Sequence, residues 1–151
     1  MNIRILSKNN IEKAIMKGIK DKTAIISFSD PVYKKRIDKS YKTVDFSQTN
    51  CRVFKISVLD VDIQYLKDYG LDYSSFFPEA NDLAKFIKQA YNDGYDIICQ
   101  CDYGQSRSAG CAAAIREYYY KDGIKIFKDY RYYPNQLIFN KVYKALKNID
   151  L

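Results

Sequence analysis

The segment from residue 95 to residue 115 constrains the fold of this chain more than any other. An apolar, strand-like run at 95–100 leads to Cys101, and an alanine-rich, helix-like run begins at Arg107. A buried strand that passes through a short loop into a helix is typical of parallel α/β sheets. Five residues separate Cys101 from Arg107. A thiol and a guanidinium therefore border one short loop, here called the cysteine loop (residues 101–107), and the thiol is expected at its mouth.

The rest of the chain repeats this alternation. Apolar or alternating runs predict strands, and apolar residues at helical spacing predict helices. The polar segment 32–51 is predicted to be a loop with room for a short strand, and 60–77 an irregular excursion. We expect one α/β domain over residues 1–151, with a central, largely parallel sheet flanked by helices. The predicted strands are 3–6, 23–28, 52–59 and 95–100, and the predicted helices are 7–18, 78–92, 107–120 and 134–147.

Composition excludes several classes of protein. The 151 residues, 47% hydrophobic and 28% charged, suit one domain with a sizeable core. No apolar run approaches the roughly 20 residues of a membrane helix. The apolar run in residues 1–6 is too short, and is interrupted by a charge too early, to be a secretory signal. The net charge is +7, but the 25 basic residues are scattered among 18 acids. We expect a monomeric, cytoplasmic protein with a solvated lysine-rich surface, without a membrane or nucleic-acid partner.

Cysteine and histidine usage narrows the chemistry. Without a secretory signal, Cys51, Cys99, Cys101 and Cys111 are expected to be reduced thiols. The chain has no histidine, which excludes Ser-His and Cys-His catalysis. The cysteine spacing also lacks the paired pattern of zinc sites, so neither a metal nor a cofactor is expected. Cys99 and Cys111 are interpreted as core residues. The alternative is that one of them, or Cys51, traps an oxidised Cys101 as a disulfide.

The cysteine loop suits an anion. A helix that begins at Arg107 presents unpaired N–H groups and a positive dipole end, which also favours the thiolate over the thiol. Gly104 lets the backbone curl without obstruction, and Arg107 can offer two parallel hydrogen bonds to phosphate oxygens. Ser108 places a hydroxyl in the first helical turn, within reach of the sulfur. The loop therefore places a possible nucleophile, the Cys101 thiol, next to backbone N–H groups and an arginine that can bind an anion.

The segment Cys101-Asp-Tyr-Gly-Gln-Ser-Arg107-Ser108 resembles the Cys-x5-Arg signature of the cysteine-dependent protein tyrosine phosphatases. It is most similar to the small dual-specificity branch and its compact bacterial relatives. Segments 56–60, 74–77, 84–90 and 133–135 also resemble that branch, so the resemblance spans roughly residues 52–147. It implies a dual-specificity phosphatase-like fold and a metal-free phosphatase.

The resemblance also implies a role for each residue of the site. Cys101 would attack phosphorus and form a cysteinyl-phosphate, while Arg107 clamps the phosphate oxygens. Ser108 would stabilise the departing thiolate. An aspartate would protonate the leaving group and then activate water. The backbone N–H groups implied to bind phosphate belong to Asp102, Tyr103, Gly104, Gln105, Ser106 and Arg107.

Two departures from the family pattern concern this site. Gln100 stands where the family usually has a histidine, so a neutral amide precedes the nucleophile. The spacing from Asp60 to Cys101 is longer than in typical small members. This spacing leaves the general acid open: Asp60 is favoured, Asp62 follows, and Asp68 and Asp72 are weaker candidates.

Three functional hypotheses follow. The first is a phosphomonoester hydrolase, a protein tyrosine or dual-specificity phosphatase that acts on a phosphorylated protein or a small phosphomonoester. The second is a phosphopeptide-binding pseudophosphatase, motivated by Gln100 and the open acid assignment. The third, a sulfur-transfer or arsenate-reducing enzyme, is disfavoured by the position and length of the loop. The loop interior carries Asp102 and no lysine, which argues mildly against polyanionic headgroups.

Overall fold

Four parallel strands form the centre of the computed structural model, which describes residues 1–150. The strands are β1 (Ile3–Ser7), β2 (Thr23–Ser29), β3 (Arg52–Ser57) and β4 (Asp96–Cys101). Their order across the sheet is β1-β4-β2-β3, and every neighbouring pair is parallel. All four predicted strands are present, and the predicted α/β class with a parallel sheet is confirmed.

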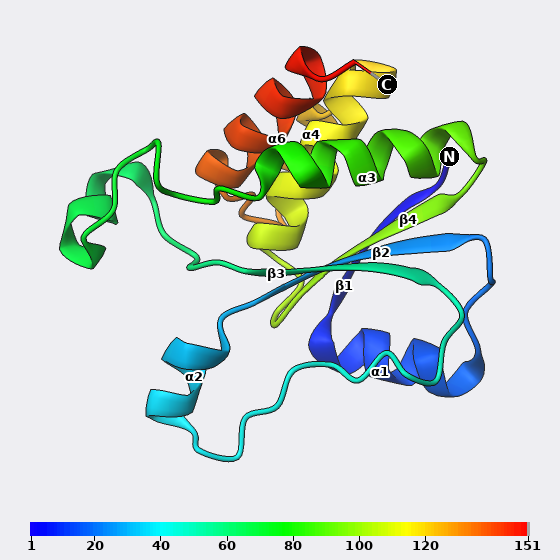
Figure 1. The fold of residues 1–151 in the computed structure, drawn as a ribbon, viewed down its shortest axis with the longest axis horizontal. Helices are drawn as coiled ribbons and strands as arrows, with labels where there is room; N and C mark the ends of the chain where they lie inside the picture. The colour runs from blue at the N-terminus through cyan, green and yellow to red at the C-terminus, as the bar shows by residue number, and fades with distance from the viewer. Residues whose placement is uncertain (151) are drawn as a thin grey trace.

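Helices cover both faces of the sheet (Figure 1). α3, α4 and α6 lie together on one face, and α1 lies on the other. The helical segments are α1 (Lys8–Lys17), α2 (Pro31–Ile37), the 3₁₀ segment η1 (Ile63–Tyr69), α3 (Ala80–Asn92), α4 (Arg107–Tyr120), α5 (Ile124–Phe127) and α6 (Gln136–Asn148). The four predicted helices correspond to α1, α3, α4 and α6. Within residues 1–150, no helix combines the length and apolar character needed to cross a bilayer.

The prediction of an irregular segment at 32–51 is wrong in its first part, where α2 forms. The Asp30 side chain accepts a hydrogen bond from the Tyr33 N–H, and Pro31 occupies the first turn, both typical of a helix start. No residue of α2 is buried. Hydrophobic periodicity therefore could not reveal this helix.

Central strand β2 explains why the sheet needs cover on both sides. Ala24 and Phe28 belong to the main core beneath α3, α4 and α6, whereas Ile25 packs with Ile11 and Ile98 beneath α1. A parallel strand buried on both faces is mostly apolar, and six of the seven residues of β2 are buried. The two cores fix the sheet between its helices.

Strand register places the functional loops at one edge. Ser7, at the end of β1, pairs with Cys101, at the end of β4, and Ser29 pairs with Ser57 at the ends of β2 and β3. The cysteine loop, the start of α2 and the segment after β3 therefore emerge side by side. Ligands of parallel α/β sheets bind at this carboxyl edge.

Candidate active site

Cys101 is the last residue of β4 and is only 2% exposed. Its Sγ lies 3.1 Å from the Ser108 Oγ in the first turn of α4, so the predicted reach of this hydroxyl is confirmed. Cys101 therefore lies where the cysteine loop begins, as expected, with its side chain buried and its sulfur against α4.

The backbone of the cysteine loop keeps its N–H groups free of internal partners. For Asp102 through Ser106, no hydrogen-bond acceptor lies within residues 1–150. Gly104 has a φ of +67°, a region that favours glycine. Successive unpaired N–H groups next to a helix N-terminus form a concave site for an anion.

Gly104→Ala is expected to distort this loop. An added Cβ would lie 2.6 Å from the Ser7 backbone nitrogen, so the loop or the end of β1 has to move. Strain at positive φ and the clash together are expected to lower the free energy of unfolding by about 1–3 kcal/mol. Urea unfolding measures the loss, and vanadate titration measures the anion site.

Gly94→Ala is the matched control for Gly104→Ala. Gly94 also has a positive φ, +76°, but a Cβ added there would meet no atom within 4 Å. The control should carry the conformational penalty without the clash and leave vanadate affinity unchanged. Equal losses of stability and equal vanadate affinity in the two variants would contradict the assigned packing of Gly104.

Arg107 is buried and held from one side. It is 5% exposed, and its Nη1 donates to the Val58 carbonyl oxygen at 3.0 Å. Its Nη2 contacts the Asp102 Oδ2 at 3.4 Å, and its Nε has no partner within residues 1–150. A buried N–H without an acceptor is rare and costly. An oxyanion in the loop would satisfy it and could pair with the Nε and Nη2 edge.

Asp102 connects the loop to segments distant in the sequence. Its carboxylate accepts a hydrogen bond from the Tyr41 hydroxyl at 2.7 Å and lies 4.0 Å from the Lys34 Nζ on α2. Burial and the bond to Asp102 raise the pKa of Tyr41 above its ordinary value, so this hydroxyl remains a donor. The sequence did not single out Tyr41 or Lys34. Both lie in the segment that carried no periodic signal.

Asp60 contacts the cysteine loop directly. Its Oδ1 accepts hydrogen bonds from the Ser106 hydroxyl at 2.7 Å and from the Asn135 amide at 2.9 Å. The same Asn135 amide also donates to the Val61 carbonyl oxygen, and its Oδ1 caps α6 by accepting from Ile138. Asn135 therefore ties the start of α6 to the loop that carries Asp60.

Asp62 lies outside this contact network. It precedes η1 and makes no side-chain capping bond. It borders a hollow of about 360 Å³ beside Asp60 and Ser106, which Arg107 does not line. The structure therefore brings Asp60, and not Asp62, into contact with the loop residue that precedes α4.

A smaller hollow of about 170 Å³ opens above Arg107. Cys101 does not line it, but Asp60 does. Its walls are aromatic: Tyr33, Tyr69 and Tyr103 border it, together with Lys34. The Lys34 Nζ lies 4.8 Å from the centroid of the Tyr103 ring. The site therefore combines the Arg107 guanidinium, which can bind an anion, with the rings of Tyr33, Tyr69 and Tyr103 around it.

The neighbouring cysteines and Gln100 are buried. A hydrogen bond with Cys111 and burial raise the pKa of Cys99 well above its ordinary value, so this thiol stays protonated. The interpretation of Cys99 and Cys111 as core residues is confirmed by their burial. The Gln100 Oε1 accepts a hydrogen bond from the Ser27 hydroxyl on β2. Residues 1–150 contain no cluster of acids, cysteines or histidines suited to a metal ion.

Comparison with known proteins gives structural matches alone. No protein-family model matches the chain, and no curated protein matches it in sequence. Human DUSP28 is 13% identical with a TM-score of 0.57, over 96% of this chain and 91% of that one. Tk-PTP in its active form is 11% identical, with a TM-score of 0.58 over 99% and 94%. PTPMT1 in complex with PI(5)P is 13% identical, with a TM-score of 0.56 over 97% and 90%. The chain therefore has the fold of the dual-specificity and protein tyrosine phosphatases.

Proposed function

We propose that this protein is a cysteine-dependent phosphomonoester hydrolase that acts on protein phosphotyrosine. One observation carries the proposal: the N–H groups of Asp102 through Ser106 and the buried Arg107 Nε lack acceptors within residues 1–150, in the loop that follows Cys101. These donors suit the three non-bridging oxygens of a phosphoryl group. The fold of the structural neighbours supports the same assignment.

The proposed reaction proceeds in two steps. The Cys101 thiolate attacks phosphorus, the bond from phosphorus to the ester oxygen breaks, and Asp60 gives its proton to that oxygen. Water then attacks the cysteinyl-phosphate, Asp60 takes the proton, and the thiolate leaves with inorganic phosphate as the product. The Ser108 hydroxyl, 3.1 Å from the sulfur, is close enough to stabilise that thiolate.

The surroundings of the loop support an aryl phosphate. The hollow above Arg107 is walled by Tyr33, Tyr69 and Tyr103, which offer flat surfaces to a ring. The loop interior carries the acid Asp102 and no lysine, which disfavours headgroups with several phosphates. The inositol lipid bound by PTPMT1 is therefore not carried over to this chain.

Purified protein should hydrolyse para-nitrophenyl phosphate in the presence of EDTA, because the proposed reaction uses no metal. A phosphotyrosine peptide should be turned over faster than a phosphoserine peptide of the same sequence. Mass spectrometry of acid-quenched protein should find phosphate on the peptide that contains Cys101. Turnover that requires added metal, or a labelled site elsewhere, would refute the proposed chemistry.

A phosphopeptide-binding role without turnover is the second candidate. The contact between Asp102 and Arg107 favours it, because it partly neutralises the clamp that must stabilise the transition state. Under this alternative, phosphotyrosine peptide binds in calorimetry while EDTA-resistant hydrolysis is negligible. The two measurements therefore separate the two candidates.

A further inference from the structure

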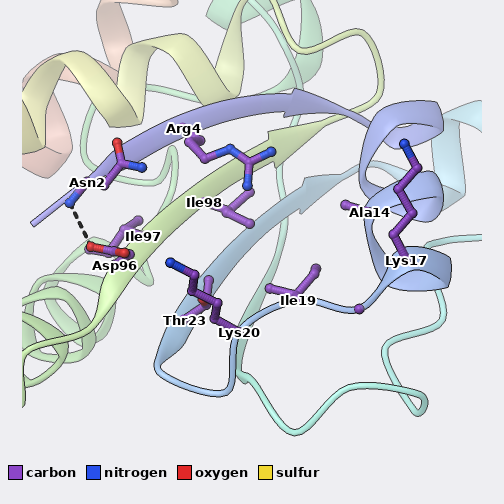
Figure 2. A pocket seen from close by; sticks show the side chains of 11 residues that line it. Asn2, Arg4, Ala14, Lys17, Ile19, Lys20, Thr23, Asp96, Ile97 and Ile98 are labelled. Atoms are coloured by element: carbon purple, nitrogen blue, oxygen red, sulfur yellow. Dashed lines mark hydrogen bonds between the residues drawn. The ribbon is translucent and has the colours of Figure 1, made fainter.

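A further hollow, of about 310 Å³, lies at the end of the sheet opposite Cys101, the last residue of β4. Figure 2 shows the side chains that line it. It is bordered by the amino ends of β2 and β4, by β1 and by the end of α1. Its floor is apolar, and its rim is basic. The apolar side chains on this face are Ala14, Ile19 and Ile98, and the basic residues are Arg4, Lys17 and Lys20. Ile97 also borders the hollow, but its side chain packs in the main core on the other face of the sheet.

The basic side chains at this rim are not neutralised by the protein. Within residues 1–150, no carboxylate pairs with Arg4, Lys17 or Lys20, and none of their side chains donates a hydrogen bond. The one acid that lines the hollow, Asp96, accepts a hydrogen bond from the Asn2 N–H. Like charges gathered at one rim repel one another unless an anion lies between them.

Arg4 and Lys20 are more informative than Lys17 about a bound anion, because Lys17 has another explanation. Lys17 lies in the last turn of α1, where the negative end of the helix dipole accounts for a cation. Arg4 on β1 and Lys20 in the loop after α1 have no such explanation. Figure 2 shows their side chains on either side of Ile98, over the apolar floor.

We propose that this hollow binds a small organic anion, an apolar ring that bears carboxylate or phosphate groups. The ring would cover Ile19 and Ile98, and the anionic groups would meet Arg4 and Lys20. A volume of about 310 Å³ lies at the lower end of the range for small-molecule sites. This site is separate from the cysteine loop and does not depend on the proposed phosphatase activity.

Two probes that a phosphatase cannot hydrolyse test the site: benzene-1,3,5-tricarboxylate and phenylphosphonate. Amide NMR signals of residues 17–23 and 96–98 should shift on titration with at least one of them, and the tighter probe identifies the preferred anionic group. Arg4→Gln and Lys20→Gln should each weaken that probe about tenfold, the value of one charge-assisted hydrogen bond. Citrate, which has three carboxylates but no ring, should bind more weakly than the tricarboxylate.

Lys85→Gln is the matched control, because Lys85 is an exposed lysine on α3 that has no ion pair within residues 1–150 and borders none of the three hollows described. It should change affinity less than about twofold. Signals that shift at residues 102–107 alone would overturn the proposal. Equal weakening by all three variants would also overturn it, because diffuse surface charge would then explain the binding.

Discussion

Cys101→Ser is expected to abolish turnover while the anion site survives. A serine hydroxyl in place of the thiolate is a far weaker nucleophile at neutral pH, so kcat toward para-nitrophenyl phosphate should fall by at least about 10³-fold. The loop N–H groups and Arg107 remain, so the variant should still bind phosphotyrosine peptide in calorimetry. Steady-state kinetics with EDTA and thermal unfolding of the same sample separate lost chemistry from lost structure.

Cys51→Ser is the control for this prediction. Cys51 is a half-buried thiol just before β3, away from the cysteine loop, and its replacement should leave kcat within about twofold. Full activity in Cys101→Ser would refute the assigned nucleophile. Loss of peptide binding in a variant that still unfolds at the wild-type temperature would place the anion site elsewhere.

The sequence was most informative about features whose residues lie close together along the chain. Cys101, Arg107 and Ser108 lie within eight consecutive residues, and a strand followed directly by a helix determines how they meet. The four strands were predictable for a similar reason. β2 and β4 are short runs buried on both faces of the sheet, and β3 carries apolar residues at alternating positions.

Contacts across long sequence distances were not predictable. Tyr41 reaches Asp102 across 61 positions, and Asn135 reaches Asp60 across 75. Such contacts depend on where exposed or irregular segments pass over the sheet edge, and no periodic pattern encodes that path. Asp60 and Asp62 illustrate the limit. The long spacing between Asp60 and Cys101 left Asp62 open beside the favoured Asp60, and the contacts of Asp60 with Ser106 and Asn135 distinguish the two.

Asp102 bears on the proposed phosphatase function through its contact with Arg107. Its carboxylate approaches the Arg107 guanidinium, and it is held in place by the Tyr41 hydroxyl. A bound phosphate dianion would meet this carboxylate as a neighbouring like charge. Under the proposed function, Asp102 would limit how strongly the loop holds a dianion and would orient the Arg107 guanidinium toward it.

Asp60→Asn is expected to lower kcat for phenyl phosphate by about 100-fold, the lower end of the usual contribution of a general acid. The amide oxygen can still accept from the Ser106 hydroxyl and the Asn135 amide, so the loop geometry should persist. The loss should be smaller with para-nitrophenyl phosphate, because that leaving group is stable without a proton.

Asp62→Asn provides the matched comparison, two positions along the same segment. Its side chain makes no capping bond and borders no hollow that contains Arg107, so kcat should change less than about twofold for either substrate. Kinetics of both variants with both substrates over a range of pH make the comparison. A large loss confined to Asp62→Asn would assign the proton transfer to Asp62 and require the segment after β3 to move when substrate binds. Equal sensitivity of both substrates to Asp60→Asn would leave Asp60 a structural support for Ser106.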